Sequence, residues 1–91
     1  MNKSEMIDRI VHKSDISRST VSAVVDHVFD EITDALAKGE EARFVGFGTF
    51  EARCREAREG RNPQTGEPVQ IPAQRVPKFA AGKGFKTALN A

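Results

Sequence analysis

The chain is 91 residues long, with 38% hydrophobic and 30% charged residues, which leaves room for one domain that buries only a modest share of its surface. Five basic and eight acidic side chains give residues 1–40 a net charge of −3, and nine basic and five acidic give residues 41–91 a net charge of +4, so the two halves are expected to face different partners. No apolar stretch could span a bilayer, no signal-peptide pattern is present, and Cys54, the single cysteine, excludes an internal disulfide and a cysteine-based zinc cluster. These features predict a soluble, unsecreted protein that gains stability from a partner subunit.

Two helices are predicted in residues 1–40. Asn2 can cap the first helix, and apolar residues recur at helical spacing to about Lys13. A short interruption follows, and Ser17 is a good cap for a second helix that Gly39 closes. The second helix carries one continuous apolar stripe, made of Val21, Val24, Val25, Val28, Phe29, Ile32 and Leu36. Packing of this stripe can offset the lower helix propensity of its β-branched residues.

Alternation of apolar and polar residues after Gly39 predicts a β-hairpin around the turn Gly46–Gly48. Its second strand continues as a polar segment to the glycine and proline cluster at residues 60–66, and a return strand follows from Val69 to Val76. Two strands of about ten residues result, each on the order of 30 Å long at about 3.3 Å per residue. They are too polar to belong to a compact core.

Two features complete the predicted fold. Pro68 and Pro72 cannot donate backbone hydrogen bonds, so the return strand is an edge or irregular strand and the ribbon over residues 53–75 is expected to project. A last helix is predicted from about Lys83 to Leu89, burying Phe85 and Leu89. The fold class is therefore α+β.

The charged residues of the ribbon are mostly arginines. Five arginines stand against three glutamates: Arg53, Arg55, Arg58, Arg61 and Arg75 against Glu56, Glu59 and Glu67. Arginine suits phosphate contacts and insertion into a narrow, electronegative minor groove. A solvated hairpin of mixed charge would show the same alternation, so the charges alone leave both interpretations open.

The tip of the ribbon reads Gly-Arg-Asn-Pro-Gln-Thr-Gly over Gly60–Gly66. Asn-Pro favours a turn, and Gly66 is free to take a positive φ. Pro63 is a rigid apolar wedge, and the side chains of its neighbours can hydrogen-bond the base-edge acceptors of a minor groove. An ordinary tight turn would use the same glycines and proline, so the tip fits either a DNA wedge or a simple turn.

The tip, together with several other motifs, resembles the bacterial histone-like HU/IHF family. The resemblance extends over essentially the whole chain, through Met1-Asn2-Lys3, Val45–Phe50, the spaced Arg55 and Arg58, Gly60–Gly66, Val76-Pro77, Phe79 and Gly82-Lys83. It implies an intertwined dimer in which residues 1–40 form a helical base, residues 41–52 and 76–82 a three-stranded antiparallel saddle sheet, residues 53–75 a DNA-binding β-arm, and residues 83–91 a C-terminal helix.

The resemblance also implies a function. The chain is expected to bind double-stranded DNA through the minor groove with little sequence preference, and to bend, wrap and stabilise it in the cytoplasm, at the bacterial nucleoid. It implies no enzyme activity, cofactor or metal, and no membrane or small-molecule partner. Besides a homodimer, a heterodimer with a paralogue is possible.

The family pattern assigns site residues by position. Pro63 would be the intercalating wedge, and the remaining DNA contacts would be Lys3, Arg53, Arg55, Arg58, Arg61, Asn62, Gln64, Thr65, Gly66, Arg75, Lys83 and Lys86. The shared core of the dimer would be filled by Phe29, Phe44, Phe47, Phe50 and Phe79.

Some positions depart from the most basic family members. Glu67, Gln70 and Gln74 stand where lysine is common in HU-like relatives, which predicts weaker phosphate affinity because fewer counterions would be released. Pro72 and Arg75 look IHF-like, so a site-preferring DNA bender is an alternative. The opening residues and Val76-Pro77 favour the HU-like interpretation.

Three further alternatives are weaker. A helix-turn-helix would place residues 18–38 in a major groove, but that helix carries Asp26, Asp30, Glu31 and Asp34, which phosphates would repel. A protein-interaction module could use the hairpin edges for strand addition, for which the prolines are poor templates. An enzyme is the weakest, because His12 and His27 lack a nearby set of metal ligands.

Overall fold

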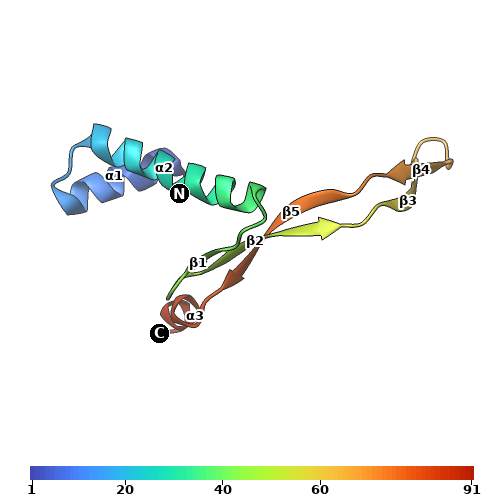
Figure 1. The fold of residues 1–91 in the computed structure, drawn as a ribbon. Coiled ribbons are helices and arrows are strands. Elements are labelled where there is room, and N and C mark those ends of the chain that lie inside the picture. Colours follow the sequence, from blue (N-terminus) through green and yellow to red (C-terminus); the bar gives the residue numbers. More distant parts are fainter. The chain divides into compact units, whose positions relative to one another are not determined.

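Caps and apolar spacing set the helices in the first part of the chain. The computed structural model describes residues 1–91, which form two compact units, Met1–Asp34 and Ala35–Ala91. Helix α1 runs from Lys3 to Ser14, and its cap Asn2 accepts a hydrogen bond from the Glu5 amide at 2.9 Å. Helix α2 runs from Arg18 to Ala37 (Figure 1). Both predicted helices are confirmed.

A small apolar core joins α1 to α2. Ile7, Val21 and Val25 are buried, and they are the only buried hydrophobic side chains of the whole chain. Two ion pairs on the surface also link the helices, Lys3 to Asp26 at 2.6 Å and Arg18 to Asp8. Exposed ion pairs of this kind add little stability, so the helical unit depends on its apolar contacts.

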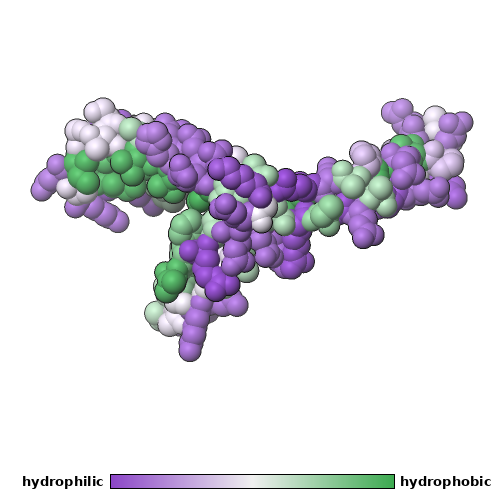
Figure 2. All heavy atoms as spheres, viewed as in Figure 1, coloured by the Kyte–Doolittle hydropathy of each residue, from purple (hydrophilic) through white to green (hydrophobic).

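The apolar stripe of α2 is wider than the core it meets. Val24, Val28 and Phe29 remain 54%, 49% and 47% exposed. Figure 2 shows hydrophobic residues gathered at the surface of the helical unit. No helix combines the length and apolar character needed to cross a membrane.

Three antiparallel strands form the sheet of the second unit. They are β1 (Ala42–Phe44), β2 (Gly48–Arg55) and β5 (Gln74–Ala81), in the order β1-β2-β5. The predicted turn at Gly46–Gly48 joins β1 to β2, with the Phe47 amide bonded to the Phe44 carbonyl at 3.0 Å. At Gly48 a Cβ would lie 2.5 Å from the Phe79 ring, so only glycine allows this close packing.

Beyond the sheet, β3 (Arg58–Arg61) and β4 (Pro68–Ile71) form a separate two-stranded ladder. The prediction of two continuous strands of about ten residues was therefore wrong. Both strands are interrupted, at residues 56–57 on one side and 72–73 on the other. The physical cause lies at Pro72, which has no N–H to donate across the ribbon.

Helix α3 (Lys83–Leu89) ends the fold and contributes to an aromatic cluster. Phe47 stacks on Phe85 with ring centroids 4.9 Å apart, and Phe50 lies against Phe79 at 4.7 Å. Burial of Leu89 was predicted wrongly, since its side chain is 73% exposed in the single chain. The helix is only seven residues long and directs just Phe85 into the cluster.

Candidate nucleic-acid interface

The ribbon tip is a closed turn held by its own backbone. The Asn62 amide donates to the Glu67 carbonyl at 2.8 Å, and the Gly66 amide donates to the Asn62 carbonyl at 2.7 Å. Gly66 has a φ of 73°, which glycine adopts at little cost. These bonds make the tip a defined shape on a narrow ribbon.

The tip side chains divide between those that build the turn and those that are free of it. The Asn62 side-chain oxygen accepts from the Gln64 amide at 2.9 Å, and the Thr65 hydroxyl accepts from the Glu67 amide at 3.3 Å. Pro63, between them, is exposed at the turn. The predicted wedge is thus presented outward, while Asn62 and Thr65 are partly committed to holding it.

Three more of the predicted contact residues surround this turn. Arg61 is exposed, and its guanidinium donates to the Gly66 carbonyl at 3.5 Å, a long bond that holds it weakly. The Gln64 side chain and the Gly66 backbone are exposed as well. The structure therefore brings the predicted tip residues Arg61–Gly66 together on one turn.

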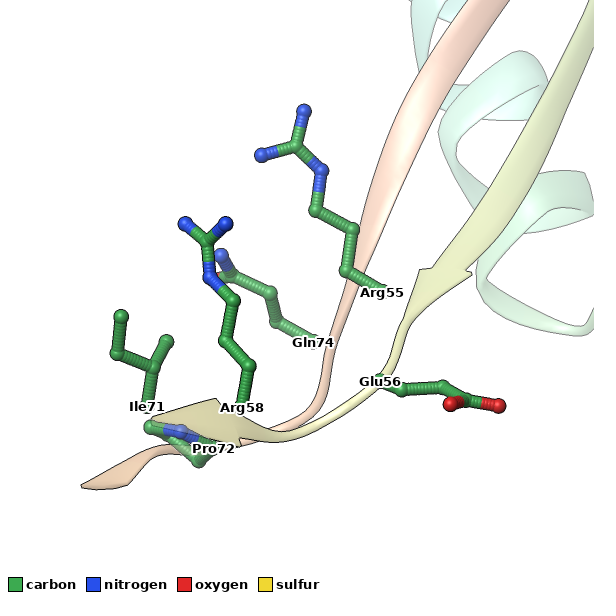
Figure 3. A pocket seen from close by; sticks show the side chains of 6 residues that line it. All are labelled: Arg55, Glu56, Arg58, Ile71, Pro72 and Gln74. Atoms are coloured by element: carbon green, nitrogen blue, oxygen red, sulfur yellow. The ribbon is translucent and has the colours of Figure 1, made fainter. Parts of the chain in front are cut away.

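Two arginines line a hollow where the two ladders meet. The hollow has a volume of about 260 Å³ and is lined by Arg55, Glu56, Arg58, Ile71, Pro72 and Gln74. Figure 3 shows Arg55, Arg58, Gln74 and Ile71 projecting from the same side of the ribbon, and Glu56 pointing away from them. A concave surface with two guanidinium groups and an amide suits an anion such as a phosphate.

The remaining basic residues differ in what they contact. Arg53, on β2, lies 3.4 Å from the Glu51 carboxylate, and Lys3, in the helical unit, is paired with Asp26. Lys83 and Lys86 are exposed on α3. DNA contacts by these four residues remain predictions.

Arg75 has a contact that the sequence analysis missed. Its guanidinium donates to the carbonyls of Leu36 and Ala37, the first of them a close contact and the second at 3.1 Å. These are among the last carbonyls of α2, which lack partners within the helix and attract cations. A contact between positions so far apart in sequence has no local signal. A DNA contact by Arg75, which would compete with these bonds, remains a prediction.

Charge follows the division into units. Residues Met1–Asp34 carry four basic and seven acidic side chains, and residues Ala35–Ala91 carry ten basic and six acidic. The net charges are therefore −3 and +4. The basic unit contains the sheet, the ribbon and its tip. An arginine-rich β-ribbon ending in an exposed proline is typical of the class of β-ribbon proteins that bind nucleic acid.

Comparison with known proteins gives the family. The model of the family described as bacterial DNA-binding protein matches residues 1–90, and the chain belongs to this family. It is 51% identical to the DNA-binding protein HU of Geobacillus stearothermophilus over 89 residues, covering 98% of this chain and 99% of that one. Its identity to DNA-binding protein HU 1 of Bacillus subtilis is 49%, covering 98% and 97%.

Solved structures agree in fold. An Anabaena HU cocrystal structure with DNA has a TM-score of 0.90 at 44% identity and covers 98% of this chain and 97% of that one. HU from Thermotoga maritima has a TM-score of 0.70 at 35% identity, with 98% of each chain covered. The predicted α+β fold and the resemblance to the HU/IHF family are confirmed.

The contact of Arg75 with α2 predicts a stability effect. Arg75→Ala should lower the free energy of unfolding by about 1 kcal/mol, because two helix-end carbonyls lose a charged donor. Urea unfolding at a fixed chain concentration measures it, with Arg58→Ala as the matched control, expected within about 0.5 kcal/mol of the unaltered chain. Equal effects of the two substitutions would contradict this role of Arg75.

Proposed function

We propose that this protein is a histone-like nucleoid-associated protein, which binds double-stranded DNA largely without sequence preference through the minor groove, bends and wraps it, and acts as a homodimer. One observation carries the proposal: a narrow ribbon presents arginines along its length and an exposed proline at its tip. The role is architectural and needs no catalytic group, and its place is the bacterial nucleoid, in the cytoplasm.

The arginines account for binding without sequence preference. Contacts to phosphates carry no sequence information and supply salt-dependent affinity by releasing counterions. Arg55 and Arg58, which line one hollow, are suited to the DNA backbone in this way. Both belong to the unit of net charge +4, whereas the helical unit of charge −3 would be repelled by phosphates.

The tip accounts for bending. An apolar side chain inserted between base steps unstacks them at a cost of a few kcal/mol and lets more DNA wrap onto the protein. Pro63 is suited to this because its ring is rigid and the turn already presents it outward. Arg61 and Gln64 flank it, with side chains able to reach base-edge acceptors.

Exposed apolar surface supports the homodimer. Phe29, Phe44, Phe47 and Phe79, predicted for the shared core, are 47%, 42%, 48% and 38% exposed. A second copy of the chain that covers these rings would supply the core that one chain lacks.

The relatives favour the HU-like over the IHF-like alternative. Every relative reported above is an HU protein, and one of the solved structures is a cocrystal with DNA. The likeness to that structure extends over the arm as well as the body, since it covers 98% of this chain. The same exposed surfaces could also pair this chain with a paralogue in a heterodimer.

A gel-shift titration tests DNA binding directly. Several unrelated short duplexes, one of them nicked, are titrated at low and moderate salt. Similar, strongly salt-dependent affinities with a preference for the nicked duplex are expected, because backbone contacts dominate and a nick bends easily. One sequence preferred by orders of magnitude would favour the IHF-like alternative. Binding to no duplex would overturn the proposal.

Phe29 tests the homodimer. Phe29→Lys should abolish dimer formation and cooperative folding at micromolar chain concentration, since a charge would be buried in the shared core. Sedimentation equilibrium and circular dichroism measure both, with Asp30→Lys on the same helix as the control. A Phe29→Lys chain that remains a folded dimer would exclude Phe29 from the interface.

Pro63 tests the wedge. Pro63→Ala should retain most of the salt-sensitive binding and reduce DNA bending, because the ring acts on base stacking and the arginines act on phosphates. A DNA cyclisation assay measures bending, with Gln70→Ala, below the tip on β4, as the control. If Pro63→Ala cyclises DNA as well as the unaltered chain, another residue produces the bend.

A further inference from the structure

The two ladders of the ribbon share one register but differ in phase. By phase we mean which pairs are hydrogen-bonded, since an antiparallel ladder alternates hydrogen-bonded and non-hydrogen-bonded pairs. Because side chains alternate between faces, all hydrogen-bonded pairs place their side chains on one face and all others on the opposite face. The phase therefore decides which residues face a ligand.

Pro77 sets the phase of the ladder between β2 and β5. It pairs with Ala52 without breaking the ladder. Proline has no N–H, so this pair must be non-hydrogen-bonded and the proline nitrogen must point away from β2. Counting three pairs along the ladder makes Arg55 and Gln74 a hydrogen-bonded pair.

The ladder between β3 and β4 is set from the tip. The Asn62 amide donates to the Glu67 carbonyl at 2.8 Å, and the adjacent pair, Arg61 with Pro68, must be non-hydrogen-bonded because Pro68 has no N–H. Three pairs further from the tip, Arg58 and Ile71 are a hydrogen-bonded pair.

These two phases cannot belong to one continuous ladder. From Arg55 and Gln74, the next hydrogen-bonded pair would be Ala57 with Pro72, which Pro72 cannot form, and Arg58 would then lie on the face opposite Arg55. Instead the ladder stops at residues 56–57 and 72–73 and restarts in the reversed phase. The shared hollow and Figure 3 agree, since Arg55 and Arg58 project from one side.

We propose that Pro72 and Pro68 are positioning residues that reverse the phase of the ribbon, so that Arg55 and Arg58 face the same stretch of DNA backbone. Pro72 stops the first ladder from extending, and Pro68 holds the second in the opposite phase. This proposal rests on the proposed function for its ligand, whereas the phase reversal is a property of the ribbon itself.

The double variant Pro68→Ala/Pro72→Ala tests the phase. Both substitutions restore an N–H, so a continuous ladder becomes possible and Arg58 should turn to the face opposite Arg55. Amide hydrogen exchange by NMR should then show a protected amide at position 72, bonded to the Ala57 carbonyl. Pro63→Ala, outside both ladders, is the matched control and should leave the exchange pattern of the ribbon unchanged.

The salt dependence of DNA binding tests whether the phase of the ladders orients Arg55 and Arg58 towards the DNA backbone. In the otherwise unaltered chain, Arg55→Gln and Arg58→Gln should each reduce the magnitude of the negative slope of log affinity against log salt by about 1. In the double proline variant, Arg58→Gln should leave the slope unchanged while Arg55→Gln still reduces its magnitude. A protein that merely lost stability would show the same slope change for both arginines.

Other results of these two experiments would each contradict one part of the proposal. An unprotected position 72 and an unchanged Arg58 effect in the double variant would show that the prolines do not set the phase. If the double variant formed a continuous ladder and Arg58→Gln still reduced its salt dependence, the phase would not decide whether Arg58 contacts DNA, and that part of the proposal would be wrong. If the unaltered chain bound no DNA, the proposed function would fail and the exchange experiment would still decide the phase reversal.

Discussion

Apolar surface that one chain cannot cover is the constraint on which the rest of the structure depends. Only Ile7, Val21 and Val25 are buried among the hydrophobic side chains, although the sequence places a full stripe along α2. The helical unit therefore presents an unfinished core, and the phenylalanines of the sheet unit are left partly exposed in the same way. Covering these surfaces stabilises the fold, and it leaves the polar ribbon as the part of the chain that is free to meet a different partner.

The ribbon can take that role because few of its side chains are needed to hold its own structure together. Backbone hydrogen bonds hold the two ladders and the tip turn, so the arginines are free to contact an anion. Only Arg75 among the five is bonded to distant backbone, at the end of α2. In the proposed function, the division of charge between the two units would direct a polyanion to the ribbon and away from α1 and α2.

Much of this could be predicted from the sequence, because the signals were local. The cap at Asn2, the helical spacing of the valines and the glycine-bounded turn at residues 46–48 each depend on neighbours in the chain. The tip also carried its own turn signal. For the family, the match of motifs along the whole chain was the decisive sequence feature.

What could not be predicted depends on pairing across the ribbon or on distant contacts. The prolines identified an irregular strand, but the break became visible only when Pro72 was placed opposite Ala57. The bonds of Arg75 to the carbonyls of Ala37 and Leu36 could not be predicted, because these residues lie 38 and 39 positions away in sequence and leave no local signal. Leu89 was predicted as buried on helical spacing, yet a seven-residue helix offers the cluster little more than one side chain.

The common register of the two ladders also limits how the length of this arm can change during evolution. Deleting one residue from β3 alone would change the pairing of every residue between the deletion and the tip, and the side chains of that part of β3 would turn to the wrong face. Residues must therefore be gained or lost opposite each other, one on each strand. A single added pair would still invert the faces of everything beyond it, so only two added pairs, four residues in all, lengthen the arm and keep its basic side intact.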